Sequence, residues 1–248
     1  MMKRWELLGQ PAFTSIAYEP EHDATMGLDQ PVYLGNDKSV YLPEGFEAGY
    51  AYPLIVWLHG HAGSERELQE VMPAVSARNY LGISFRGSMP AADGLPGTFR
   101  WSQSEDHLLA IEQEVDETLS QVKDVYRIHP QRIYVAGFGE GATVGLRLML
   151  RQPEQFAGVI SMGGAFPKLD QPLARFRSLQ GKRVLLAAGS RDTSTAAADL
   201  VSASRLLRSA GMDTTVRYYD AGHELCPNML LDIDTWVMSN ISTAYVVR

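Results

Sequence analysis

The sequence predicts an α/β fold built on a mainly parallel β-sheet with helices on both faces. Short apolar runs, many bounded by glycine, recur over the last two hundred residues, as expected for strands buried on both faces. Amphipathic stretches of helical period separate these runs. The first fifty residues instead hold short extended segments divided by turns. That region therefore predicts antiparallel strands at one edge of the sheet.

The elements follow in chain order. The edge strands are predicted at Phe13–Tyr18, Val32–Leu34 and Ser39–Leu42. The buried strands are predicted at Pro53–Leu58, Leu81–Phe85, Arg132–Ala136, Gly158–Ser161, Arg183–Ala188 and Thr214–Tyr219. Apolar residues at steps of three and four predict a helix over 108–122. Further helices are predicted at Glu140–Arg151, Ala196–Ala210 and Pro227–Asn240, where Pro153 and Gly211 follow the first two as stop signals.

The length of 248 residues suits one large domain, so we expect a single domain over residues 1–248. Residues 1–50 are its predicted β-rich edge segment. Residues 86–101 form the longest predicted loop and lie over the expected pocket, because ligands bind beyond the carboxyl ends of parallel strands. The composition is ordinary for a globular protein, with 45% hydrophobic and 21% charged residues.

The formal net charge of −7 argues against a nucleic-acid partner, because such proteins neutralise phosphates with Lys and Arg. The single cysteine, Cys226, excludes an intrachain disulfide. No apolar run approaches the length of a membrane span, and the basic start has no apolar stretch behind it. We therefore expect a cytoplasmic protein without a signal peptide or transmembrane segment.

The most informative segment is Arg132–Arg147, which reads as strand, tight glycine turn and helix. This is the shape of the nucleophile elbow G-x-S-x-G, in which a strained turn exposes a serine above the sheet. Gly137 and Gly141 match the flanking glycines. The central position is Gly139, which has no side chain and hence no nucleophile.

A dinucleotide fingerprint, G-x-G-x-x-G/A, also matches Gly137, Gly139 and Ala142. That motif requires a carboxylate about 20 residues on, at the end of the next strand, to bind a ribose hydroxyl. The next strand ends in Ser161-Met-Gly-Gly164 without an acid. We therefore expect no nicotinamide cofactor, and no other cofactor.

Three further loops favour the elbow. Such enzymes order their catalytic groups as nucleophile, acid and histidine, with the last two on loops after later strands. Asp192 follows the fifth buried strand and His223 follows the sixth, in the expected order. The glycine-rich turn His59–Gly63 follows the first buried strand, where an oxyanion-hole N–H is found in such enzymes.

Four segments together resemble the phospholipase/carboxylesterase family of α/β-hydrolases. They are Tyr52–Gly60, Phe85–Pro90, Arg132–Ala142 and Gly222–Pro227. The resemblance covers about residues 40–240 and implies an α/β-hydrolase fold, Asp192 as triad acid and His223 as general base. It also implies an oxyanion hole made by the backbone N–H groups of His61 and Glu140. The family's elbow reads Gly-Phe-Ser-x-Gly, so this chain departs from it at Gly139.

Three functions remain open from the sequence. In one, the chain is an esterase or phospholipase-type hydrolase whose acyl-enzyme chemistry was lost by natural or engineered change at Gly139. In another, it is a non-catalytic relative that binds a small ester or acyl ligand. In the last, His223 and Asp192 activate water without a serine. The oligomeric state and the acyl and alcohol groups of a substrate cannot be read from the chain.

Other candidate groups have simpler interpretations. His59 and His61 form an H-x-H pair, but no carboxylate lies at a convincing spacing, so no metal site is predicted. Cys226 is expected to be a small buried residue rather than a reactive thiolate. Ser161, Ser190 and Thr143 are substitute nucleophiles in principle and structural by expectation, since none lies at the elbow.

Two residues bracket the long loop. Arg86 begins it and Trp101 ends it, so either side chain could line a substrate pocket. The simpler alternatives are a surface position for Arg86 and core packing for Trp101, and the sequence does not separate them.

Overall fold

The computed structural model describes the backbone of residues 34–92 and 95–246, with side chains to residue 242. Its strands are β1 (Lys38–Tyr41), β2 (Tyr52–Leu58), β3 (Leu81–Phe85), β4 (Met89–Pro90), β5 (Phe99–Arg100), β6 (Ile128–Phe138), β7 (Gly158–Met162), β8 (Arg183–Gly189) and β9 (Asp213–Tyr219). Its α-helices are α1 (Leu68–Ser76), α2 (Glu105–Val125), α3 (Gly139–Arg151), α4 (Phe176–Leu179), α5 (Ala197–Ser209) and α6 (Pro227–Val246), and a 3-10 turn at Glu65–Glu67 precedes α1.

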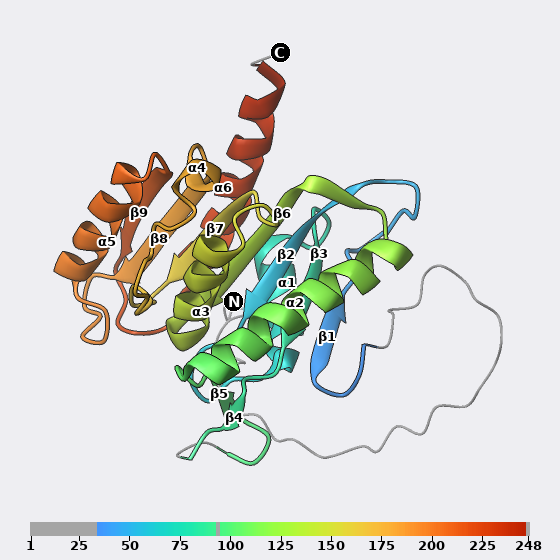
Figure 1. Cartoon of the computed structure of the whole chain (residues 1–248). Coiled ribbons are helices and arrows are strands. Elements are labelled where there is room, and N and C mark those ends of the chain that lie inside the picture. The colour runs from blue at the N-terminus through green and yellow to red at the C-terminus, as the bar shows by residue number, and fades with distance from the viewer. Residues whose placement is uncertain (1–33, 93–94, 247–248) are drawn as a thin grey trace, which may run out of the picture. The chain divides into compact units, whose positions relative to one another are not determined.

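Seven of these strands form one sheet in the order β1-β3-β2-β6-β7-β8-β9 (Figure 1). Every neighbouring pair from β3 to β9 is parallel, whereas β1 runs antiparallel to β3. The structure thus confirms a mainly parallel sheet with an antiparallel edge. Two residues each of β4 and β5 form a separate antiparallel pair within the predicted long loop.

Helices cover both faces of the sheet, and strand β2 shows why (Figure 1). Leu54, Val56 and Leu58 point to a core shared with α2, α3 and α5. Ile55 and Trp57 alternate with them and point to a second core, shared with α1 and α6. All seven residues of β2 are buried. A strand covered on both faces carries apolar residues in sequence instead of alternating with polar ones, which is the pattern that predicts it.

The predicted buried strands and the four predicted helices are all present, with ends that differ by a few residues. The apolar pattern does not predict α1, a nine-residue helix that contains Pro73. Proline removes one helical hydrogen bond and normally ends or kinks a helix. Here Leu68, Val71, Met72 and Val75 are buried against the sheet and α6, and this tertiary packing outweighs the local preference.

Some predictions concern residues outside the described part of the chain. The segment Phe13–Tyr18 and most of Val32–Leu34 fall there, so the antiparallel edge is seen only in β1. The single-domain organisation of residues 1–248 stays a prediction for the same reason. Among the described residues, no helix combines the length and the low polarity needed to span a bilayer.

Candidate active site

The elbow lies where β6 ends and α3 begins. Gly139 is the first residue of the helix and has a φ of +53°. Residues with side chains rarely adopt this left-handed conformation, whereas glycine adopts it without steric strain. A Cβ built on Gly141 would lie 2.3 Å from the carbonyl oxygens of Leu58 and His59. The flanking glycine therefore lets the end of β2 approach the first turn of α3.

Asp192 and His223 meet although they lie 31 positions apart in the chain. The Nδ1 atom of His223 lies 2.8 Å from Oδ2 of Asp192. Their loops follow β8 and β9, which are adjacent parallel strands, so both loops emerge at the same edge of the sheet. The backbone N–H of Ser190 donates to the carbonyl of Tyr219, the last residue of β9, and the N–H of Arg191 donates to the carbonyl of Ala221 in the second loop.

The Asp192 carboxylate is buried and accepts several hydrogen bonds. Its side chain is 1% exposed, and its Oδ1 atom accepts from the backbone N–H groups of Ser194 at 2.7 Å and Thr195 at 2.9 Å. Burial raises the pKa of this carboxyl, but the hydrogen bonds from His223 and the two N–H groups outweigh it, so the pKa is lowered. Asp192 is therefore a charged acceptor, which assigns the proton of His223 to Nδ1.

The other ring nitrogen of His223 faces the elbow. A Cβ at residue 139 would lie 3.4 Å from Nε2, an ordinary van der Waals distance. With the proton on Nδ1, Nε2 presents a lone pair toward this position. This geometry suits the predicted pairing of a general base with a nucleophile at residue 139, where the chain has no side chain, and the role of His223 as base stays a prediction.

The ring of His223 is held by contacts that the sequence pattern does not reveal. The Phe138 ring lies against it, with centroids 4.9 Å apart. On another side, a Cβ at Gly163 would lie 3.3 Å from Cε1 of His223, so only a residue without a side chain leaves the ring undisturbed. The hydroxyl of Thr195 donates to the Gly163 carbonyl at 2.7 Å, which ties this glycine to the Asp192 loop. The local signal for Thr195 is its spacing, three residues after the acid.

The turn after β2 is built around a buried histidine. The Nε2 atom of His59 accepts the backbone N–H of Gly87 at 2.9 Å, so the ring proton resides on Nδ1 and is donated to the Gly60 carbonyl at 2.7 Å. Burial lowers the pKa of His59, which favours the neutral ring. Both ring nitrogens are thus engaged by backbone groups. Among the described residues, no three His, Cys, Asp or Glu side chains gather as a metal site would require.

The two predicted oxyanion-hole residues are neighbours. The Nδ1 atom of His61 lies 3.4 Å from Oε1 of Glu140, and Glu140 belongs to the first turn of α3, where backbone N–H groups lack helical acceptors. Ala62, which follows His61 in the turn after β2, adopts a φ of +56°. Such conformations cost about 1–3 kcal/mol and cluster at functional sites. That these N–H groups bind an oxyanion stays a prediction.

Glu140 also fastens the long loop to the elbow. Its Oε2 atom accepts the backbone N–H of Trp101 at 2.9 Å, and its Oε1 atom lies 3.6 Å from Nη2 of Arg100. The Trp101 ring in turn donates its N–H to the His59 carbonyl at 2.8 Å. The Glu140 carboxylate therefore contacts residues 100–101 and keeps them beside the elbow.

Arg86 and Trp101 both make contacts within the protein. Trp101 is 1% exposed and packs in the core. The guanidinium of Arg86 forms an ion pair with buried Glu65 at 2.7 Å and stacks on Phe99. Neither residue lines the cavity described next. The loop they bracket approaches the site through its backbone and through Glu140.

A cavity of about 350 Å³ opens at the elbow. Its walls come from the segment before α2, from α2 and α3, and from the loops after β7, β8 and β9. The described residues that line it are Gln103, Leu108, Gly139, Glu140, Thr143, Arg147, Gly163, Ala165, Phe166, Pro167, Lys168, Ser194, Thr195 and His223. Its volume falls within the range of about 300–1,000 Å³ typical of small-molecule sites.

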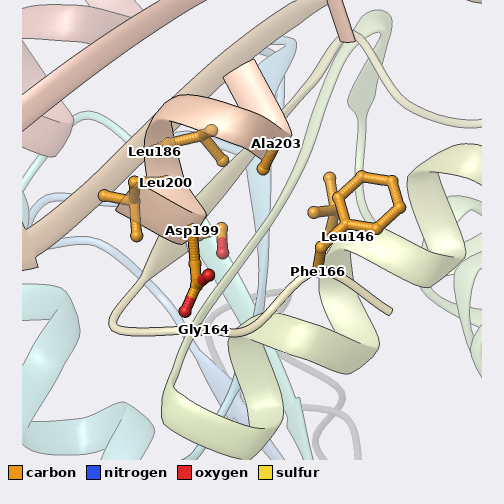
Figure 2. A pocket seen from close by; sticks show the side chains of 8 residues that line it. Leu146, Gly164, Phe166, Leu186, Asp199, Leu200 and Ala203 are labelled. Carbon is orange, nitrogen blue, oxygen red and sulfur yellow. The ribbon is translucent and has the colours of Figure 1, made fainter. Parts of the chain in front are cut away.

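A second pocket lies deeper, between α3, β7, β8 and α5 (Figure 2). Its volume is about 10 Å³, and mainly apolar side chains surround it, among them Leu146, Leu186 and Leu200. This is the size of a single water molecule. Phe166 borders both pockets, but only the larger one can admit an organic ligand.

The substitute nucleophiles lie elsewhere. Thr143 lines the cavity one helical turn after Gly139, and its hydroxyl donates to the Gly139 carbonyl at 3.3 Å. Ser161 is 2% exposed at the end of β7. Ser190 is exposed where β8 ends, and Cys226 is half-buried against the core beside α6. None of these side chains occupies the position that faces Nε2 of His223.

The dyad predicts a pH-dependent contribution to stability. The folded-state pKa of Asp192 lies below its usual value of 3.8. A carboxyl whose pKa is lowered by folding stabilises the protein above the unfolded-state pKa, and this stabilisation is lost as the pH falls through the folded-state pKa. The melting temperature of the wild type should therefore exceed that of Asp192→Asn near neutral pH. The difference should shrink as the pH falls below 3.8.

The matched control is Asp170→Asn, which removes the same charge from an exposed side chain. The difference between its melting temperature and that of the wild type should not change with pH in the way expected for Asp192→Asn, because the Asp192 contacts are intact in this variant. Thermal melts by circular dichroism at several pH values between 7 and 2 check both variants. A difference between the wild type and Asp192→Asn that is independent of pH would contradict the proposed network.

Comparisons with known proteins place this geometry in a family. Residues 95–241 match the family model described as Phospholipase/Carboxylesterase. NocK of Nocardia uniformis subsp. tsuyamanensis, a proposed esterase, is 28% identical over 170 residues, which cover 62% of this chain but only 46% of NocK. MhqD of Bacillus subtilis (strain 168), a proposed hydrolase, is 23% identical over 189 residues, which cover 73% of this chain and 90% of MhqD.

Comparison with solved structures agrees with the family match. The crystal structure of the Bacillus cereus carboxylesterase superimposes with a TM-score of 0.66 at 22% identity, over 82% of this chain and 93% of that one. The family model covers more than half of the residues and includes the elbow, the acid loop and the histidine loop. This chain belongs to the phospholipase/carboxylesterase family and has its α/β-hydrolase fold.

Proposed function

We propose that the cavity binds a small carboxylic ester or acyl compound and that the protein forms no acyl-enzyme at residue 139. The observation that carries this proposal is the pairing of His223 with Asp192 at 2.8 Å beside an elbow whose central residue is glycine. In a serine hydrolase the elbow hydroxyl attacks the ester carbonyl while histidine accepts its proton. Here the base, its orienting acid and the cavity are present, but Gly139 offers no atom to form the covalent bond.

Two measurements test this proposal together. Rapid mixing with p-nitrophenyl acetate should give no burst of p-nitrophenol, because a burst reports accumulation of an acyl-enzyme. Isothermal titration with methyl hexanoate should give saturable binding, which His223→Trp should abolish by filling the cavity. A burst would contradict the proposal, and mass spectrometry of the labelled peptide would identify the nucleophile. Absence of binding by the wild type would contradict the ligand class.

A second candidate function is slow hydrolysis by activated water, and the lone pair of Nε2 directed at the elbow favours it. In this reaction a water oxygen attacks the ester carbonyl while Nε2 of His223 accepts the water proton. The tetrahedral intermediate then expels the alkoxide, which takes that proton from His223 and leaves as the alcohol. Asp192 stabilises the imidazolium between the two steps.

Removal of the base distinguishes this reaction from binding alone. His223→Gln should lower steady-state turnover of p-nitrophenyl acetate by about 10²-fold, a typical contribution of general base catalysis. Its affinity for methyl hexanoate should change little, because glutamine is of similar size. Thr143→Ser is the control, since it alters a cavity residue away from Nε2. Equal turnover by the wild type and His223→Gln would exclude the water reaction and leave the binding function.

A further inference from the structure

One face of α3 runs along the cavity from its reactive end to a buried cation. Gly139, Thr143 and Arg147 all line the cavity and are spaced four residues apart. Residues at this spacing lie on one face of a helix, and eight residues correspond to about 12 Å along its axis. The cavity thus has a reactive end and a cationic end.

Arg147 is buried, and only part of its guanidinium is bonded to protein. Its side chain is 2% exposed. Its Nε atom donates to Glu112 at 2.8 Å and its Nη2 atom donates to Glu105 at 2.9 Å. Its Nη1 atom has no acceptor among the described residues, although a guanidinium has five N–H donors in all. The Nη1 atom is not one of the fully buried polar atoms that lack a partner among the described residues, so it keeps accessible surface. Because Arg147 lines the cavity, these N–H groups are available to a ligand there.

Lys168 adds a second cation to the same cavity. It follows β7 on an exposed loop, lines the cavity and has no ion pair or hydrogen bond with any described residue. Arg147 is already balanced by two carboxylates, and Arg151 also contacts Glu112 at 3.5 Å. Lys168 is therefore an unbalanced positive charge at the cavity wall.

The other residues that line the cavity indicate which parts of a ligand are apolar and which end of the ligand lies at the elbow. Leu108, Phe166 and Pro167 supply apolar surface in the same cavity. Glu140 lines the cavity next to the elbow, where its carboxylate disfavours a second anion. A ligand with an uncharged reactive end, an apolar middle and an anionic far end matches this distribution of charge.

We propose that the acyl group of the ligand ends in a carboxylate, so that the ligand is a half-ester of a dicarboxylic acid. Its ester carbonyl lies at Gly139 and His223, and its free carboxylate accepts hydrogen bonds from Nη1 of Arg147 and from Nζ of Lys168. This inference rests on the proposed function, because it names the acyl compound that the cavity takes. Charge-assisted hydrogen bonds to carboxylate are among the stronger polar contacts in proteins, so the second carboxylate sets the specificity.

Isothermal titration with monomethyl adipate and methyl hexanoate tests the proposal, because the two esters differ mainly in the terminal carboxylate. The wild type should bind the half-ester about tenfold more tightly, equivalent to about 1.4 kcal/mol. Lys168→Met should reduce this preference. Arg147→Lys, which keeps the charge beside Glu112 but lacks Nη1, should reduce it further. Each variant should lose more affinity for monomethyl adipate than for methyl hexanoate, because methyl hexanoate lacks the carboxylate that these side chains bind.

Arg151→Met is the matched control, because Arg151 contacts the same Glu112 but does not line the cavity. Its preference for the half-ester should equal that of the wild type. Circular dichroism verifies the fold of each variant, and Lys168→Met carries the test if Arg147→Lys does not fold. Equal affinities for both esters, or a preference that survives both substitutions, would overturn this inference while the proposed function stands. Binding of neither ester would overturn both.

Discussion

The Gly139→Ser variant should hydrolyse p-nitrophenyl acetate faster than the wild type by at least about 10²-fold. A Cβ at residue 139 would lie 3.4 Å from Nε2 of His223, so a serine Oγ can come within hydrogen-bond reach of about 2.6–3.2 Å. Asp192 already orients the ring at 2.8 Å. The upper limit is about 10⁶-fold, the loss of turnover found when a triad serine is removed in another hydrolase. A fluorophosphonate should also label residue 139 in this variant.

The backbone conformation of residue 139 makes the Gly139→Ser substitution moderately destabilising. A φ of +53° costs a residue with a side chain about 1–3 kcal/mol, so the variant should melt at a lower temperature than the wild type. Gly139→Ala is the matched control, because it has the same backbone strain but no hydroxyl. It should show the same loss of stability and no gain of activity. His223→Ala in the Gly139→Ser background should remove the gain.

A folded Gly139→Ser protein that neither hydrolyses the ester nor reacts with the fluorophosphonate would show that the site lacks more than its nucleophile. The predicted oxyanion hole of His61 and Glu140 would then be the first element to re-examine, because one donor of this kind contributes about 10²–10³ in rate. The binding function would become the leading interpretation of the cavity.

Gly141→Ala should destabilise the protein by about 3 kcal/mol, the upper end of the usual range for overpacking. Its added Cβ would lie 2.3 Å from the carbonyl oxygens of Leu58 and His59, and neither backbone segment can rotate away as a flexible side chain would. The first turn of α3 must therefore separate from the end of β2. The melting temperature should fall by about 6–12 °C for a chain of this length.

The same displacement should weaken ligand binding, because this turn also holds Gly139 and Glu140 at the cavity. Gly222→Ala is the control, since a Cβ there meets no atom within 4 Å although the residue precedes His223. Thermal melts and titration with methyl hexanoate measure both effects. A Gly141→Ala protein as stable as Gly222→Ala would show that the approach of β2 to α3 is looser than the structure indicates.

Much of the architecture could be predicted because its signals are local. The run Leu81–Phe85 is β3 with the predicted ends, since an apolar run of this length bounded by turn residues is long enough for a strand but too short for a typical helix. The order of elbow, acid loop and histidine loop indicated that Gly139, Asp192 and His223 would share one edge. Parallel strands bring their carboxyl ends to the same side of a sheet whatever their order. The sequence does not predict helix α1, because Pro73 disfavours a helix locally. Burial of the apolar residues of α1 stabilises this helix in the folded protein.

The sequence by itself determined the alternation of strands and helices, the family and the absence of a side chain at residue 139, because each depends on residue identity along a short stretch. Only the tertiary structure decided that Trp101 is buried in the core whereas Arg147 lines the cavity with a free Nη1. Both outcomes depend on elements distant in the chain, such as Glu112 of α2 against Arg147 of α3. Periodicity shows which face of a helix is buried, but only the packed elements show what lies opposite that face.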